Sequence, residues 1–191
     1  PYGTVERPFN PGELVIGAHG TFFARSIDAE VNLTTECMVA ASKHDGLSVI
    51  EVLVNCMIFN NGTHKAFAGD KEVRAEHTIT LRQGEKMLFG KNMDKGLMLD
   101  NMKLKVVTVG ENGVTLDDIL VHDAHEKDTM VHVMLASMKY PDFPVALGII
   151  RDVAEPTYER EVARQIAEVQ ATAKIKNVDD LLNSGETWEV E

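Results

Sequence analysis

Apolar residues follow two patterns along this chain. Runs rich in β-branched and aromatic residues predict buried strands at 21–27, 49–54 and 145–150. Between the first two runs, apolar residues recur at helical spacing and predict an amphipathic helix over about 33–44, ended by His44 and Gly46. Strand, helix and strand from Thr21 to Val54 therefore predict a βαβ unit with parallel strands and a right-handed crossover.

Further helices are predicted at both ends of the chain. Asn10 followed by Pro11 predicts an N-cap and a short helix that ends at Gly17 or Gly20. Helical spacing also predicts helices over 129–139 and from Thr157 onward, and a short helix stops at Gly185. The last segment has exposed apolar residues, so we expect it to dock on this chain or on a partner.

The middle of the chain has a different pattern of apolar and polar residues. Residues 62–76 have no clear period and predict a loop. Strand-like segments at 78–81, 86–89 and 103–109, separated by glycine turns and an exposed turn at 92–96, predict an antiparallel β appendage. The predicted fold class is therefore α/β. It comprises an α/β domain at 1–62, the β-rich appendage at 63–114 and, at 115–191, a helical segment, a further strand and a C-terminal helical tail that packs on the core.

Composition excludes several classes of function. The chain has 191 residues, 44% hydrophobic content and a formal net charge of −11, so it can bury a core but has no basic footprint for nucleic acid or an anionic membrane. No run approaches the roughly 18 apolar residues of a membrane span. The amino terminus is neither a signal peptide nor an initiating methionine, so we expect a piece of a longer polypeptide. Two distant cysteines predict a reducing compartment, by default the cytoplasm.

The candidate chemistry lies at cysteines and histidines. Cys56 comes directly after the strand at 49–54 and before an Asn-Asn-Gly turn, where an open α/β sheet places its ligands. The alternative for Cys56 is a buried structural thiol. Cys37, on the apolar face of its helix, is predicted to belong to the core. His122 and His125 are three residues apart and could bind a divalent ion, but we favour the alternative of a solvated junction.

Five stretches resemble one family in the same order along the chain. They are Arg7–Pro11, Phe22–Asp28, the Cys56–Asn61 segment Cys-Met-Ile-Phe-Asn-Asn, Phe89–Gly96 and Pro156–Glu159. Together they resemble the β subunit of 2-oxoacid:ferredoxin oxidoreductases, most closely the 2-oxoglutarate type. In that family, the segment that Cys56–Asn61 resembles supplies one cysteine to an iron–sulfur cluster.

The resemblance implies a fold, an activity and partners. The fold would be the carboxy-terminal half of a thiamine diphosphate-binding domain. The whole enzyme would oxidatively decarboxylate 2-oxoglutarate or a related 2-oxoacid to an acyl-CoA and reduce ferredoxin. Its cofactors would be thiamine diphosphate, Mg²⁺ and a [4Fe–4S] cluster. Its partners would be the α subunit, ferredoxin, the 2-oxoacid and coenzyme A, in an oligomer, and no nucleic acid or membrane.

Only Cys56 is carried over, as a metal ligand. Gly69-Asp70-Lys71 is not the family's Gly-Asp-Gly motif, so we assign no catalytic or cofactor-binding residue. A four-iron cluster needs four ligands and the chain has two cysteines, so we expect the chain alone to hold no cluster and to be inactive. The alternative hypothesis is a non-catalytic binding or assembly module. The sequence leaves open which 2-oxoacid is used.

Overall fold

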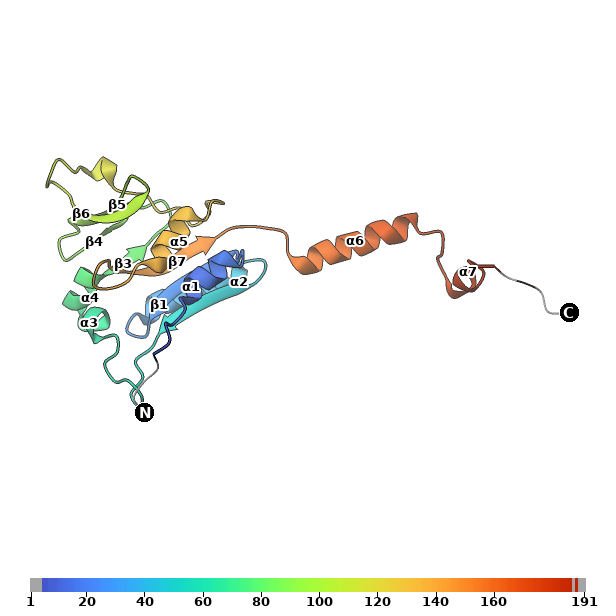
Figure 1. The fold of residues 1–191 in the computed structure, drawn as a ribbon, viewed down its shortest axis with the longest axis horizontal. Helices are drawn as coiled ribbons and strands as arrows, with labels where there is room; N and C mark the ends of the chain where they lie inside the picture. Colours follow the sequence, from blue (N-terminus) through green and yellow to red (C-terminus); the bar gives the residue numbers. More distant parts are fainter. Residues whose placement is uncertain (1–4, 187, 189–191) are drawn as a thin grey trace. The chain divides into compact units, whose positions relative to one another are not determined.

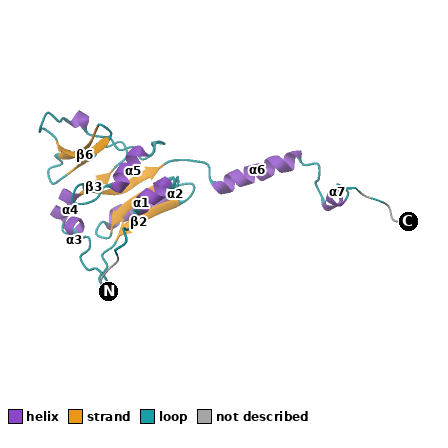
Figure 2. Cartoon of the chain, in the orientation of Figure 1, coloured by secondary structure: helices purple, strands orange, loops and turns teal. Residues whose placement is uncertain are grey.

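The computed structural model describes residues 5–186 and 188, in two compact units that divide between Ala154 and Glu155. The amino terminus and the last residues, on which parts of the predictions fall, lie outside this description. The first unit contains an α/β core and a small second sheet, and the second unit contains two helices. Figures 1 and 2 show the elements of each unit.

The main sheet has four strands in the order β2-β1-β7-β3. Strands β1 (Phe22–Ile27) and β2 (Ser48–Leu53) are parallel and in register, and α2 (Val31–Lys43) connects them. This confirms the predicted βαβ unit with its parallel strands. Strand β7 (Val145–Asp152) pairs antiparallel with β1 and parallel with β3 (Thr78–Leu81). The α/β fold class is confirmed.

Both faces of β1 are buried, which explains its continuous apolar sequence. Phe22 and Ala24 pack with Leu33 and Cys37 of α2 on one face, and Ile27, the last residue of the strand, joins the same cluster. On the other face, Phe23 packs in a second cluster with residues of α1 (Pro11–Gly17) and α5 (Met130–Ser137), mainly Ile16, Leu135 and Ala136. Alternation of side chains along a strand places neighbouring residues on opposite faces. The sheet is therefore covered by α2 on one side and by α1 and α5 on the other.

The predicted start of α1 is confirmed in detail. The Asn10 side chain accepts hydrogen bonds from the backbone N–H groups of Gly12 and Glu13, and Pro11 occupies the first helical position. The Asn10 side chain also donates to the Ala136 carbonyl oxygen at 2.8 Å. One residue thus caps α1 and ties it to α5, because its amide has both an acceptor and a donor.

The region after the Cys56 loop differs from the prediction in three ways. The predicted loop at 62–76 contains two short helices, α3 (Lys65–Ala68) and α4 (Lys71–His77), and Asp70 caps the second. Residues 78–81 form a strand as predicted, but β3 belongs to the main sheet rather than to the appendage. The predicted turn at 92–96 overlaps the start of an unpredicted strand, β5 (Lys95–Asp100). Local patterns do not encode which strand a four-residue segment will pair with.

The small antiparallel sheet consists of β4 (Leu88–Phe89), β5 and β6 (Lys103–Thr108). Its buried side chains Phe89 and Leu97 join the core cluster that contains Phe23. Thr115 begins a short 3₁₀ helix, η1 (Leu116–Asp118), through a capping box with Asp118. The sheet is therefore antiparallel as predicted, and it packs on the first unit's core.

The second unit contains α6 (Tyr158–Thr172) and α7 (Val178–Leu182), both at predicted positions. Thr157 caps α6 and Asn177 caps α7. On α6, Arg164 pairs with Glu161 and Glu168 one turn away on either side. No helix among the described residues is both long and apolar enough to cross a membrane.

Candidate functional site

The site begins where the two parallel strands end. Strands β1 and β2 run in the same direction, so Ile27 and Leu53 lie side by side at one edge of the sheet. The Asp28 backbone N–H donates to the Leu53 carbonyl oxygen at 3.1 Å, and the Asp28 carboxylate accepts the Asn55 backbone N–H at 2.9 Å. Asp28 therefore anchors the start of the loop that contains Cys56.

The loop at 55–62 is closed by hydrogen bonds from one side chain. The Asn55 amide nitrogen donates to Asn61 Oδ1 at 3.0 Å, and its oxygen accepts the Gly62 backbone N–H at 2.8 Å. Gly62 has a φ of +82°, a conformation that glycine adopts without strain. We call residues 55–62 the Cys56 loop. The Asn-Asn-Gly segment predicted as a turn is thus the end of this loop, where Asn61 and Gly62 bond to the Asn55 side chain.

Cys56 is half-buried, in contrast to the fully buried Cys37. The Phe59 backbone N–H donates to Cys56 Sγ at 3.4 Å. The pKa of the Cys56 thiol is lowered from its usual value, chiefly by this bond, with smaller contributions from the backbone at Ile58 and Asn60. A cysteine that is not fully buried and whose thiol pKa is lowered is suited to act as a soft metal ligand or as a nucleophile.

The three large apolar side chains that follow Cys56 in the loop face solvent. Met57, Ile58 and Phe59 are 72%, 85% and 89% exposed. Side chains of this type are usually buried, and a contiguous exposed group of them marks an interaction surface or a ligand site. The thiol therefore lies at the base of an exposed apolar loop tip.

Two cavities flank the loop and share His64 as a lining residue. One, of about 300 Å³, is lined by Asp28, Asn55, Asn61, Gly62, His64, Lys65, Ala68 and Gly69. The other, of about 470 Å³, is lined largely by apolar and aromatic side chains and reaches Arg25 and Glu51. Polar groups of the loop therefore line the smaller cavity, and a charged pair of the sheet lines part of the larger one.

Arg25 and Glu51 form an ion pair that the sequence analysis missed. They are register partners on β1 and β2, with Arg25 Nε 2.6 Å from Glu51 Oε2 and side chains 7% and 18% exposed. Arg25 Nη2 also donates to the Ala136 carbonyl oxygen at 3.1 Å. A charged residue inside each of two apolar strands was the available signal, because charges are rarely buried without a partner.

Cys37 is not brought to this site. Its side chain is buried in the core between α2 and the sheet, as predicted, and burial raises the pKa of its thiol. Both cysteines are free. Two thiols in environments of opposite character can be tested separately by mutation.

The histidine pair near residue 122 does not form a metal site. His122 is buried, and its Nε2 donates to the Ile149 carbonyl oxygen at 2.8 Å, while His125 Nδ1 bonds the Asp152 carbonyl oxygen. Within residues 5–186 and 188, no group of three or more His, Cys, Asp or Glu side chains could hold a metal ion. The predicted solvated junction is right for His125 and wrong for His122, whose pKa is lowered chiefly by burial.

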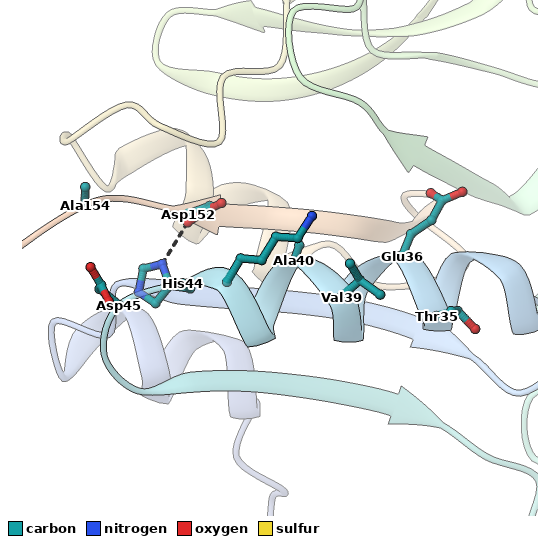
Figure 3. A pocket seen from close by; sticks show the side chains of 9 residues that line it. Thr35, Glu36, Val39, Ala40, His44, Asp45, Asp152 and Ala154 are labelled. Atoms are coloured by element: carbon teal, nitrogen blue, oxygen red, sulfur yellow. Dashed lines mark hydrogen bonds and ion pairs between the residues drawn. The ribbon is translucent and has the colours of Figure 1, made fainter.

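A separate shallow cavity of about 610 Å³ lies along α2, lined in part by His44 and Asp152 (Figure 3). His44 Nδ1 is 2.8 Å from Asp152 Oδ1, and its Nε2 is 2.8 Å from Thr21 Oγ1. The His44 side chain is 3% exposed. This chain of bonds links the end of α2 to the start of β1 and the end of β7, at the opposite end of β1 from Cys56. These hydrogen bonds have a structural role, because they hold the three elements together.

Comparison with known proteins finds relatives in sequence and in fold. No model of a known protein family matches the chain. Over 194 aligned residues, covering all of this chain, it is 32% identical to the 2-oxoglutarate oxidoreductase subunit KorB of Mycobacterium tuberculosis. The chain is therefore related to KorB subunits. It spans about half, 51%, of the length of that relative.

One further sequence relative and one solved structure are also similar to this chain. The 2-oxoglutarate synthase subunit KorB of Archaeoglobus fulgidus is 38% identical over 56 residues, which cover 29% of this chain and 21% of that protein. A solved structure, the 2-oxoglutarate:ferredoxin oxidoreductase of Magnetococcus marinus with 2-oxoglutarate, coenzyme A and succinyl-CoA bound, superposes with a TM-score of 0.58. The match covers 98% of this chain and 48% of that one at 15% identity, so it shows a shared fold. The resemblance to the β subunit of this family is confirmed.

Proposed function

We propose that this chain is part of the β subunit of a 2-oxoacid:ferredoxin oxidoreductase and that Cys56 is one thiolate ligand of its [4Fe–4S] cluster. The observation that supports the ligand role is the direction of the Phe59 N–H group, which donates to Cys56 Sγ at 3.4 Å. Backbone N–H groups aimed at a ligating sulfur stabilise its negative charge and tune the potential of a cluster. Cys56 is not fully buried, which is consistent with a ligand role.

The residues of this chain fit one position of such a cluster. Four thiolates or equivalent ligands are required, and Cys37 is buried on another element. We therefore propose that the remaining ligands come from polypeptide outside this chain and that the chain alone neither binds the cluster nor oxidises 2-oxoglutarate. When bound, the cluster supplies one-electron transfer toward ferredoxin.

No residue of the described chain is assigned to thiamine diphosphate or Mg²⁺. The turn at 69–71 lacks the expected motif, and Asp70 Oδ1 is used to cap α4 through the N–H groups of Glu72 and Val73. We propose that these cofactors bind elsewhere in the whole enzyme. The enzyme would act with an α subunit in the cytoplasm, converting a 2-oxoacid and coenzyme A to an acyl-CoA and carbon dioxide while reducing ferredoxin.

The test compares two cysteine variants in the whole β subunit with its partner subunit. After anaerobic iron–sulfur reconstitution, Cys56→Ala should lose most of the visible absorbance and iron content, because one ligand is removed. Cys37→Ala should keep both and lose only on the order of 1 to 2 kcal/mol of stability, because a small buried group is removed.

Iron content that survives in Cys56→Ala would reject the ligand role. A separate outcome is that the unmutated subunit binds no iron after reconstitution. The alternative of a non-catalytic binding module would then replace the proposed function.

A further inference from the structure

The Cys56 loop lacks the apolar packing that usually fixes a loop. Its tip residues Met57, Ile58 and Phe59 are 72%, 85% and 89% exposed, so they bury little surface against the core. A loop without buried apolar surface depends on hydrogen bonds for a single conformation. The conformation of the loop must therefore be explained by its polar contacts.

Most of these contacts converge on Asn55. Its backbone N–H is held by the Asp28 carboxylate at 2.9 Å, which fixes Asn55 to the end of β1. Its side chain then reaches across the loop to Asn61 Oδ1 at 3.0 Å and to the Gly62 N–H at 2.8 Å. The amide nitrogen is also 3.2 Å from Met57 Sδ. One anchored side chain thus contacts the beginning and the end of the loop.

The bonds inside the loop depend on this closure. The Asn60 N–H donates to the Cys56 carbonyl oxygen at 3.1 Å, and the Phe59 N–H donates to Cys56 Sγ at 3.4 Å. Both form across the chain reversal that brings residues 59 and 60 back toward residue 56. Opening the ends of a short loop widens the reversal and separates these donors from their acceptors.

We propose that Asn55 is a positioning residue that clamps the Cys56 loop and sets the direction of the Cys56 thiol. The assignment of that thiol as a cluster ligand rests on the proposed function, whereas the clamp is a property of this chain. Asn suits the role because its side chain offers an acceptor and donors together. Asp can replace the acceptor half of this function, and Ala can replace neither half.

The test measures amide hydrogen exchange by NMR in the 191-residue chain. In Asn55→Ala, exchange should accelerate roughly tenfold at Gly62, whose bond is deleted, and also at Asn60, which does not contact the Asn55 side chain. In Asn55→Asp, Gly62 should stay protected. The matched control is Thr63→Ala, which deletes the bond from Asn60 Nδ2 to Thr63 Oγ1 and should leave the exchange at Gly62 and Asn60 unchanged.

Exchange at Ala24 in β1 verifies that each variant is folded, and Asn55→Asp still decides the question if Asn55→Ala does not fold. The clamp is rejected if Asn60 exchange is the same in Asn55→Ala and in the unmutated chain, or if Gly62 loses protection in Asn55→Asp. A second measurement uses the reconstituted whole subunit, in which Asn55→Ala should change the electron paramagnetic resonance signal of the reduced cluster. If Cys56→Ala keeps its iron while the exchange results hold, the proposed function fails and the clamp stands.

Discussion

The buried ion pair between Arg25 and Glu51 provides a quantitative test of the core. Changing Glu51→Gln keeps the shape of the side chain and an oxygen that can accept from Arg25 Nε, but it removes the negative charge. The Arg25 side chain is 7% exposed, so its charge would remain in the interior without a counterion. Breaking one partner of a buried pair costs about 3–5 kcal/mol. Because one hydrogen bond survives, we expect a loss of about 3 kcal/mol.

Removing both charges should cost less than removing one. The double variant Arg25→Met, Glu51→Leu leaves no unpaired charge, but it deletes the bond from Arg25 Nη2 to the Ala136 carbonyl oxygen. We expect this variant to lose about 1 kcal/mol, the net value of one hydrogen bond. If the double variant loses less stability than Glu51→Gln alone, the loss in the single variant comes from the unpaired buried charge and not from missing contacts.

Urea unfolding followed by far-ultraviolet circular dichroism measures these differences. The control is Glu36→Gln, which removes one partner of the Arg82–Glu36 pair on the same unit, where the side chains are 49% and 51% exposed. An exposed pair contributes about 0–1 kcal/mol. If Glu51→Gln loses no more stability than Glu36→Gln, or less than the double variant, the argument from charge burial is wrong.

Other variants test the pH dependence, the sheet and the exposed surface. Burial lowers the pKa of His122 below its usual value of 6.5, so below that pH the unfolded chain binds a proton that the folded chain does not. The free energy of unfolding should therefore fall as the pH falls below about 6.5. The slope should be up to about 1.4 kcal/mol per pH unit. His122→Gln should make this dependence less steep in urea unfolding from pH 7.5 to 5, although not flat, because burial also lowers the pKa of His132. An unchanged slope would contradict the argument. Gly148→Ala should lower the free energy of unfolding by about 1–3 kcal/mol, because Gly148 has a φ of +101° and a Cβ would lie 2.7 Å from the Leu81 carbonyl oxygen. Gly84 has a φ of +75° and open space around the position of a Cβ, so Gly84→Ala measures the cost of backbone strain alone. An equal loss of stability in both variants would show that the clash with the Leu81 carbonyl oxygen contributes nothing. The chain should self-associate through the tip of the Cys56 loop, and Phe59→Ser should shift its sedimentation toward monomer, whereas Val5→Ser, at a site that is also exposed, should not.

The sequence by itself determined the local elements whose signals lie within a few residues. Asn10 and Pro11 specify the start of α1 because a cap and a fixed φ act locally, and the βαβ unit follows from two apolar runs around an amphipathic helix. The resemblance to the β subunit of 2-oxoacid:ferredoxin oxidoreductases was also readable from the sequence, since the order of short motifs, with Cys56–Asn61 among them, needs no coordinates. The position of Cys56 after β2 followed directly.

Only the tertiary structure decided which segments meet. Thr78–Leu81 is a strand by local preference, but its pairing with β7 depends on residues more than sixty positions away. The burial of His122 depends on Ile149, which is 27 positions away and lies on β7. The Arg25–Glu51 pair exists because the register of β1 and β2 places the two charges opposite each other. The Asn55 backbone N–H meets the Asp28 carboxylate because the parallel strands β1 and β2 end side by side. Pairing between distant segments is set by the sum of packing over the whole core, which no local pattern contains.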